Sequence, residues 1–135
     1  MHKHLTIDNR LDQLQRVASF VEEICEEVGL GADLVFNLNL VLEEAVTNVI
    51  MYAYTDESLH SIKITAIAGN GVLTLTVEDD GMAFDPTQVP DADVTLSAEE
   101  RPIGGLGIFL IRKIMDEVAY ERNGDCNTLT MRKKL

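Results

Sequence analysis

The spacing of apolar residues changes along this chain, and the order of the changes restricts the fold. Apolar residues recur at helical spacing over residues 11–28 and again over residues 33–54, which predicts two helices. Over residues 62–79 they alternate with polar residues on both sides of the tight-turn signal GNG, which predicts a β-hairpin. Asp8 or Asn9 is the expected N-cap of the first helix.

Shorter elements complete the order. A strand is expected near residues 4–7 and a third helix over residues 106–117. Two final strands, near residues 118–121 and 128–132, flank an NGD turn. Residues 81–105 hold all three prolines and no sustained period, and loops this long are usually functional or disordered. The order β-α-α-β-β-loop-α-β-β predicts an α+β fold, a two-layer α/β sandwich with a mixed, mostly antiparallel sheet and helices on one face.

The composition fits one soluble domain. A chain of 135 residues, 46% of them hydrophobic and 25% charged, can bury a core without disulfides, so residues 1–135 are expected to form a single domain. The N-terminal residues show no apolar signal core, and no run reaches the roughly 18 apolar residues of a membrane span. We therefore expect a cytoplasmic protein without a membrane partner. Cys25 and Cys126 lack metal-ligand spacing, which favours a reducing compartment and ordinary packing.

The chain is strongly acidic. It carries 11 basic and 23 acidic residues, for a net charge of −12. Nucleic acid is therefore not expected as a direct partner, because phosphate contacts need clustered lysine and arginine. An acidic surface favours solubility, and it also suits docking onto a basic patch of a partner protein.

The second predicted helix carries polar side chains in partly apolar surroundings. At about 100° per residue, its core face holds Leu38, Leu42, Ala45, Val49 and Ala53. Glu44 and Asn48 lie one turn apart on a lateral stripe, which they share with Leu40 and Met51. Glu43 points about 100° away from that stripe. A solvated surface stripe is one interpretation. The other is that a carboxylate and an amide oxygen on one rigid face meet a hydrated magnesium ion and its ligands.

Two glycine-containing motifs follow. TLTVEDDGMAFDP ends in two acids and Gly81, and a sharp turn is predicted there because glycine permits positive φ. In RPIGGLGIFLIRKIMDEV, Gly104, Gly105 and Gly107 precede or open an amphipathic helix, where freed backbone amides can bind an anion. Taken singly, an acidic turn and a flexible hinge explain these motifs as well.

Several other phosphate-binding classes are excluded. No glycine loop ends in GK[ST], so the chain has no P-loop, and no G-x-G-x-x-G follows a predicted strand. The HRD and DFG signatures of eukaryotic-type kinases are also missing.

Together and in this order, the three motifs resemble the GHKL ATPase superfamily with its Bergerat fold. Within it, the chain most resembles the stand-alone anti-sigma-factor serine kinases of bacteria. The resemblance rests on LEEAVTNVIMYAY, which matches the N-box, and on VEDDGMAFDP and GGLGIFLIRKIMDEV, which match the two glycine boxes. It spans nearly the whole chain.

The resemblance implies a role for each matching residue. Glu44 corresponds to the catalytic base and Asn48 to the magnesium-coordinating asparagine of the family. Asp79 matches the aspartate that accepts a hydrogen bond from the adenine amino group, and Gly81 matches the close turn beneath the base. Ala83 stands where many relatives have a second glycine.

The remaining roles concern the phosphates and the base pocket. Residues 84–103 match the ATP lid, with Gly105 and Gly107 at its phosphate end. Arg101 is the one cation in the lid and a candidate ligand of the γ-phosphate. Thr128 resembles the threonine that supports the adenine pocket.

The resemblance also implies the activity. It indicates an ATP- and Mg²⁺-dependent serine/threonine kinase that phosphorylates a small STAS-type anti-anti-sigma protein and sequesters a sigma factor. A homodimer is a further expectation, since relatives are often dimers. The alternative is a nucleotide-dependent binding module that holds its partner without phosphorylating it. The ATP-binding half of a histidine kinase fits less well, because the chain has no room for a dimerisation helix pair.

Overall fold

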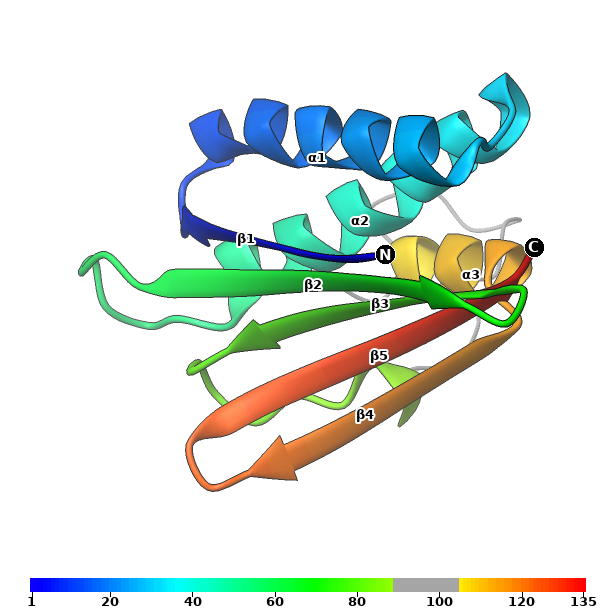
Figure 1. Cartoon of the computed structure of the whole chain (residues 1–135). Helices are drawn as coiled ribbons and strands as arrows, with labels where there is room; N and C mark the ends of the chain where they lie inside the picture. Colours follow the sequence, from blue (N-terminus) through cyan, green and yellow to red (C-terminus); the bar gives the residue numbers. More distant parts are fainter. Residues whose placement is uncertain (89–104) are drawn as a thin grey trace.

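The structure, a computed structural model, describes residues 1–88 and 105–135 of the chain. In this part of the chain, one five-stranded sheet is covered on a single face by three α-helices (Figure 1). The strands are β1 (His2–Asp8), β2 (Ser61–Gly69), β3 (Val72–Asp79), β4 (Glu117–Asn123) and β5 (Cys126–Lys134). The helices are α1 (Leu14–Val28), α2 (Ala32–Tyr52) and α3 (Gly105–Ile114), with short 3-10 turns η1 (Leu11–Gln13) and η2 (Pro86–Gln88).

The strand order across the sheet is β1-β2-β3-β5-β4, and each of these pairings is antiparallel. The predicted α+β two-layer sandwich is confirmed, although the described strands form an antiparallel sheet rather than a mixed one. The GNG signal gives the β2–β3 hairpin, with positive φ at Asn70 (54°) and Gly71 (75°), as a two-residue turn requires. The β3–β5 register sets Asp79 opposite Asn127 at one end of the sheet.

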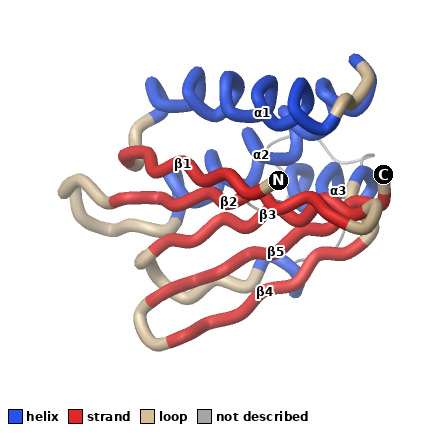
Figure 2. The backbone as a smooth tube through the Cα atoms, in the orientation of Figure 1, coloured by secondary structure: helices blue, strands red, loops and turns tan. Residues whose placement is uncertain are grey.

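The core lies between the sheet and the helix layer (Figure 2). Alternation along β2 and β3 buries every second residue, namely Ile62, Ile64, Ala66, Leu73, Leu75 and Val77. The α1 residues that meet this layer are Val17, Phe20, Val21, Ile24 and Cys25. Each large aliphatic side chain buried in this way contributes about 1.5–3 kcal/mol.

Helix α2 packs on the sheet between α1 and α3. Leu38, Leu42 and Ala45 of the predicted core face are buried in α2, together with Val41 and Val46, whereas the predicted Val49 is only partly buried. By length and composition alone, this 21-residue helix with a mean hydropathy of 1.4 is apolar enough to cross a membrane. In the folded domain, 28% of the most apolar stretch of this helix is buried.

Two predicted helix ends are wrong. Neither Asp8 nor Asn9 caps α1, because the η1 turn intervenes and α1 begins at Leu14. The Asn9 side chain instead accepts a hydrogen bond from the backbone N–H of His60 at 2.9 Å, which joins the end of β1 to the start of β2. Helix α3 ends at Ile114 rather than near residue 117, since the N–H of Asp116 already bonds to a carbonyl of β5.

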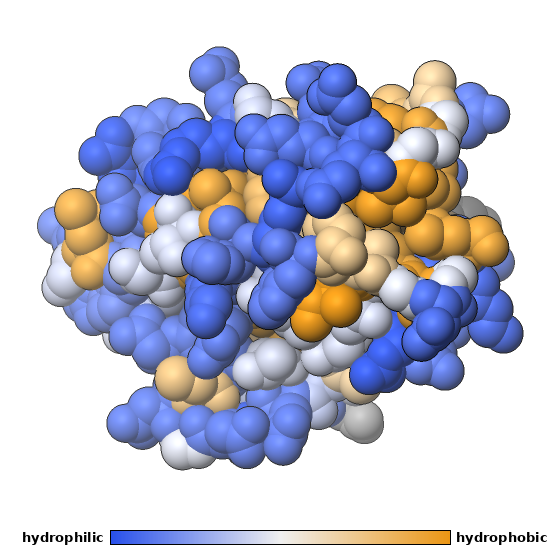
Figure 3. Space-filling view, viewed as in Figure 1, coloured by the Kyte–Doolittle hydropathy of each residue, from blue (hydrophilic) through white to orange (hydrophobic). Residues whose placement is uncertain are grey.

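Hydrophilic side chains cover most of the face seen in Figure 3, in keeping with the high content of charged residues. Apolar residues gather mainly on the right of this view, where Figure 1 places the end of α1 and α3.

Candidate active site

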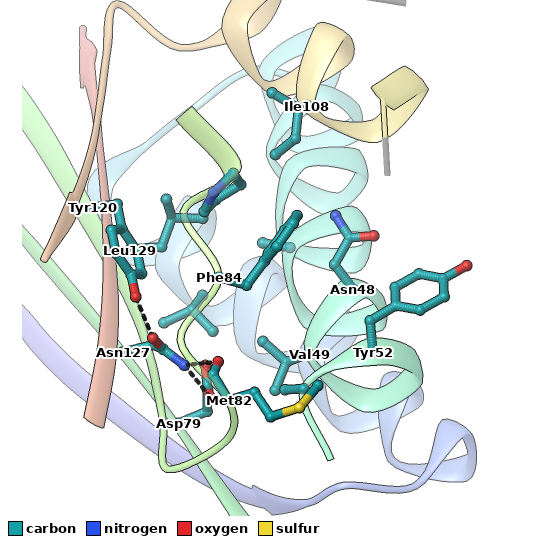
Figure 4. Close-up of a pocket in the computed structure, with 14 residues that line it drawn as sticks. Asn48, Val49, Tyr52, Asp79, Met82, Phe84, Ile108, Tyr120, Asn127 and Leu129 are labelled. Atoms are coloured by element: carbon teal, nitrogen blue, oxygen red, sulfur yellow. Dashed lines mark hydrogen bonds between the residues drawn. The ribbon is translucent and has the colours of Figure 1, made fainter. Parts of the chain in front are cut away.

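A pocket of about 520 Å³, including its open mouth, lies between the end of α2 and the end of β3. Helix α2 contributes Ala45, Asn48, Val49 and Tyr52, and the residue after it is Ala53. The sheet contributes Val77, Asp79, Tyr120, Asn127 and Leu129, and the remaining lining residues are Met82, Phe84, Pro86 and Ile108. The walls are mostly apolar, with a few polar side chains that converge on the cavity (Figure 4).

A buried carboxylate forms the polar end of the pocket. Asp79 is only 6% exposed, and its Oδ1 accepts hydrogen bonds from the Gly81 N–H and the Asn127 Nδ2, each at 2.9 Å. Within the described part of the chain, Oδ2 receives no hydrogen bond. Asp79 can therefore accept one donor from a ligand, as an exocyclic amino group would supply.

Asn127 was not identified from the sequence, and it is the β5 side chain that meets Asp79. Besides its bond to Asp79, its Nδ2 donates to the Met82 carbonyl at 2.8 Å. Its Oδ1 accepts from the Tyr120 hydroxyl and from Arg122 Nη1, the latter at 3.1 Å. Asn127 is 6% exposed, so this buried amide is fully hydrogen-bonded.

The structure does not bring Thr128 to the pocket. Side chains alternate along a strand, and the neighbours Asn127 and Leu129 both line the cavity. Thr128 pairs with Glu78 in the register and lies on the opposite face of the sheet. Thr128, which was expected to support the base pocket, therefore does not line this cavity.

Gly81 is close to the end of α2, but its backbone does not have the positive φ that was expected. A Cβ on Gly81 would lie 2.5 Å from the Cβ and 2.5 Å from the carbonyl oxygen of Ala53. The next residue, Met82, donates its N–H to that same carbonyl at 2.8 Å. Glycine is required here by close approach to α2. Ala83 is exposed and does not line the cavity.

The two motif residues of α2 meet the second glycine box. A Cβ on Gly107 would lie 2.6 Å from Glu44 Oε2 and 3.6 Å from Asn48 Nδ2, so the α3 backbone packs directly on both side chains. Glu44 is half-buried, and this burial raises the pKa of its carboxyl; repulsion from Glu43 raises it further. Gly105 is the first residue of α3, and Arg101 lies outside the described residues.

The donor set fits a nucleotide with its metal ion. Mg²⁺ is usually held by one or two side-chain oxygens together with substrate phosphates. In residues 1–88 and 105–135, no group of three or more acidic, histidine or cysteine side chains could hold a metal ion by itself. The side-chain oxygen of Asn48, beside the start of α3, offers one such ligand, and the apolar walls that lead to Asp79 suit a flat base.

An aromatic and acidic cluster joins the segment after α2 to Asp80, the residue that follows β3. His60 stacks on Tyr54 with ring centroids 4.1 Å apart, and its Nδ1 lies 3.4 Å from Asp80 Oδ1. Its Nε2 lies 2.8 Å from Asp56 Oδ1. Burial and the negative charges of Asp79 and Asp80 raise the pKa of Tyr54, which therefore stays neutral.

Comparison with known proteins agrees with this geometry. Residues 7–133 match the model of the histidine kinase-like ATPase domain. The serine/threonine-protein kinase BtrW of Bordetella bronchiseptica is 30% identical, with 83% of this chain and 79% of that protein aligned. The serine-protein kinase RsbW of Listeria monocytogenes is 31% identical over 70% of this chain, and the match spans 63% of RsbW. The anti-sigma F factor of Geobacillus kaustophilus is 26% identical over 99% of this chain and 90% of its own length.

The fold has the same relatives. A crystal structure of the RsbU and RsbW domains of a Mycobacterium tuberculosis protein superposes on this chain with a TM-score of 0.71 at 20% sequence identity. The superposition covers all of this chain and 32% of the other one. The predicted resemblance is confirmed, and the named relatives support the predicted enzyme class, a protein kinase.

Proposed function

Because this chain belongs to the histidine kinase-like ATPase family, we propose that it is an ATP-dependent serine/threonine-protein kinase that acts as an anti-sigma regulatory factor. The protein kinase class and the use of ATP follow from the family and its named relatives. The hydroxyl-bearing substrate, the metal ion and the regulatory partners are the proposed part. Residues 1–135 would act as one cytoplasmic domain.

The observation that supports this proposal most is the packing of Gly107 on the Glu44–Asn48 pair. It joins a carboxylate of raised pKa, which does not itself line the pocket, to the pocket-lining amide of Asn48 and to the start of α3. Asp79 lies at the other end of the same pocket. The spacing of these groups along one cavity supports a nucleotide with its base toward Asp79 and its phosphates toward Asn48.

Asp79, Asn48 and Glu44 each have a defined role in the proposed reaction. Asp79 accepts a hydrogen bond from the base, and the apolar walls exclude water from it. Asn48 would hold Mg²⁺, which neutralises charge on the phosphates when bound. Glu44 then accepts the proton of the attacking hydroxyl while the terminal phosphoryl group passes from ATP to that oxygen, leaving ADP. A positioned base adds about 10²–10⁴-fold to such a rate, and positioning supplies much of the rest.

The partners follow from the relatives and from the charge. The name of the anti-sigma relative supports a sigma factor as the sequestered partner. The phosphorylated partner that we propose, a small STAS-type anti-anti-sigma protein, rests on the resemblance of the sequence motifs. The net charge of −12 suits basic protein surfaces and disfavours direct contact with nucleic acid. A homodimer remains part of the proposal.

Glu44→Gln tests the proposed base. We expect the variant to bind Mg-ATP with the affinity of the parent and to lose at least about 100-fold in phosphoryl transfer, because the amide cannot accept the proton. The matched control is Glu43→Gln, which makes the same change at the exposed neighbouring residue and should transfer phosphate normally at pH 8. Calorimetry and phosphoserine detection on a STAS-type partner measure the two effects. Transfer by Glu44→Gln at the parental rate would overturn the assignment.

Incubation of the parent protein with Mg-ATP and a STAS-type partner also tests the alternative function, a nucleotide-dependent binding module. A nucleotide-dependent binding module would form a tighter complex with the partner in ATP and leave no phosphate on it. Glu44 favours the kinase, because it places a carboxylate next to Asn48 and the start of α3, where a general base could reach an attacking hydroxyl.

A further inference from the structure

We propose that Asn127 and Arg122 are positioning residues that fix the Asp79 carboxylate and thereby set the preference of the pocket for 6-amino over 6-oxo purine bases. This inference rests on the proposed function. Neither residue belongs to the three sequence motifs, and Arg122 does not line the pocket at all.

The orientation of the Asn127 amide is determined by its five partners. Its Oδ1 faces two donors, the Tyr120 hydroxyl and Arg122 Nη1. Its Nδ2 faces three acceptors, namely Asp79 Oδ1 at 2.9 Å, the Met82 carbonyl at 2.8 Å and the Gly81 carbonyl at 3.5 Å. A flipped amide would place oxygen against a carboxylate and a carbonyl, and nitrogen against a guanidinium, so only one orientation is stable.

The fixed amide in turn fixes Asp79. Because Asn127 Nδ2 and the Gly81 N–H both bond to Oδ1, rotation of the carboxylate would break two hydrogen bonds at a buried site. The other oxygen, Oδ2, is left as a pure acceptor for the ligand. A base with an amino group can donate to it, whereas a base with a carbonyl at that position would meet like charge and leave Asp79 unpaired.

Arg122 lies outside the pocket and donates hydrogen bonds to Asn127 and to the backbone of Gly81 and Gly124. Its Nη1 donates to the Gly81 carbonyl at 2.7 Å and to Asn127 Oδ1 at 3.1 Å, and its Nε donates to the Gly124 carbonyl at 3.0 Å. One half-buried guanidinium thus joins the turn after β3, the start of β5 and the β4–β5 turn. The hydrogen bonds of a charged donor are stronger than neutral ones, so loss of Arg122 should loosen both Gly81 and Asn127.

Nucleotide binding without turnover tests this inference. We expect the parent protein to bind ADP more tightly than GDP, and Asn127→Ala and Arg122→Ala to reduce the ADP-to-GDP affinity ratio at least about tenfold. The reduction should come from weaker ADP binding, with GDP binding little changed. Arg122→Lys keeps the charge but cannot bridge three carbonyl oxygens, so it should behave like Arg122→Ala.

Two matched controls separate positioning from general damage. Arg132→Ala removes a surface arginine that pairs with Glu117 at 3.2 Å, and Thr130→Ala truncates a side chain on the outer face of β5. Both should keep the parental ratio. Calorimetry gives the affinities, and thermal melts show that each variant is folded.

The outcomes distinguish this inference from the proposed function. If the parent binds neither nucleotide, the proposed function is wrong. If the parent prefers ADP but the Asn127 and Arg122 variants keep its ratio, or lose both affinities by the same factor, the two residues only stabilise the fold and the positioning role is wrong. Should Asn127→Ala fail to fold, Arg122→Lys carries the same test.

Discussion

Two positions of the site require glycine because neighbouring atoms leave no room for a Cβ, and not because of the backbone conformation. A Cβ at Gly81 would overlap the backbone of Ala53, which cannot move without disturbing the end of α2. A Cβ at Gly107 would overlap only the carboxylate of Glu44, the end of a flexible side chain. The same substitution should therefore reduce stability at the first glycine and displace a reacting group at the second.

Gly107→Ala is expected to fold with a Tm near that of the parent and to transfer phosphate about 100-fold more slowly, since a shift of about 1 Å in a reacting group can lower a rate by that factor. Gly81→Ala should instead lose about 1–3 kcal/mol of stability, as overpacked sites do. Gly69→Ala serves as the control, because a Cβ there meets nothing within 4 Å. Thermal melts and transfer rates check all three. Full activity in Gly107→Ala would show that the Glu44 position is not critical.

At the scale of elements, the connection from α2 to β2 is tied to the end of β3 through one histidine. Both ring nitrogens of His60 face carboxylates, Asp56 and Asp80, while its ring stacks on Tyr54. The hydrogen bond to Asp56 raises the pKa of His60 most, and the charges of Asp56 and Asp80 add to the effect. The protonated ring is thus the form that holds these elements together.

The contribution of His60 to the stability of the fold depends on pH. Because the pKa of His60 is higher in the folded chain than its ordinary value of 6.5, its contribution to stability is complete below about pH 6.5 and is lost as pH rises through the raised value. We expect the stability difference between the parent and His60→Gln to shrink from pH 6 to pH 9. Urea unfolding of both proteins across this range measures the difference, and subtraction removes all other titrating groups. A difference that stays constant would mean that His60 is not charged in the folded protein.

The sequence predicted the elements better than it predicted how the sheet faces the pocket. Helical and alternating periods located α1, α2 and the β2–β3 hairpin, because those periods arise directly from burial of one face. The end of α1 that lacks a side-chain cap could not be predicted, since the Asn9 side chain bonds to a residue 51 positions away. Contacts at such a distance along the chain leave no local signal.

The alternation of side chains along β5, extended toward its start, predicts the position of Asn127. Leu129 and Met131 both lie on the core side of β5. Because every second side chain of a strand lies on the same face, Asn127 belongs to this face as well. The prediction began the strand at residue 128, and the resemblance to the family threonine placed Thr128 in the pocket. A shift of one residue moves a side chain to the other face of a sheet, so in the structure Asn127 lines the pocket and Thr128 does not.

At the scale of the whole molecule, the pocket is where the two layers meet. Its lining comes from α2, α3, the turn after β3, and strands β3, β4 and β5, so a bound nucleotide contacts both the helix layer and the sheet. A ligand that binds only the folded chain stabilises it by mass action. Stability of the whole domain therefore reports occupancy of the site independently of catalysis.

We expect ADP with Mg²⁺ at about 100 times its Kd to stabilise the parent by about 2.7 kcal/mol, which for a domain of this size raises Tm by about 10 °C. Glu44→Gln should keep this rise, because its carboxylate is needed for proton transfer rather than for holding the base. Asp79→Asn should lose most of it, since an amide at this position can turn a donor toward the amino group of the base. Differential scanning fluorimetry over a range of ADP and GDP concentrations measures the shifts. An equal rise with ADP and GDP in the parent would show that the buried carboxylate does not distinguish the bases, and the pocket would then have to recognise its nucleotide through the phosphates alone.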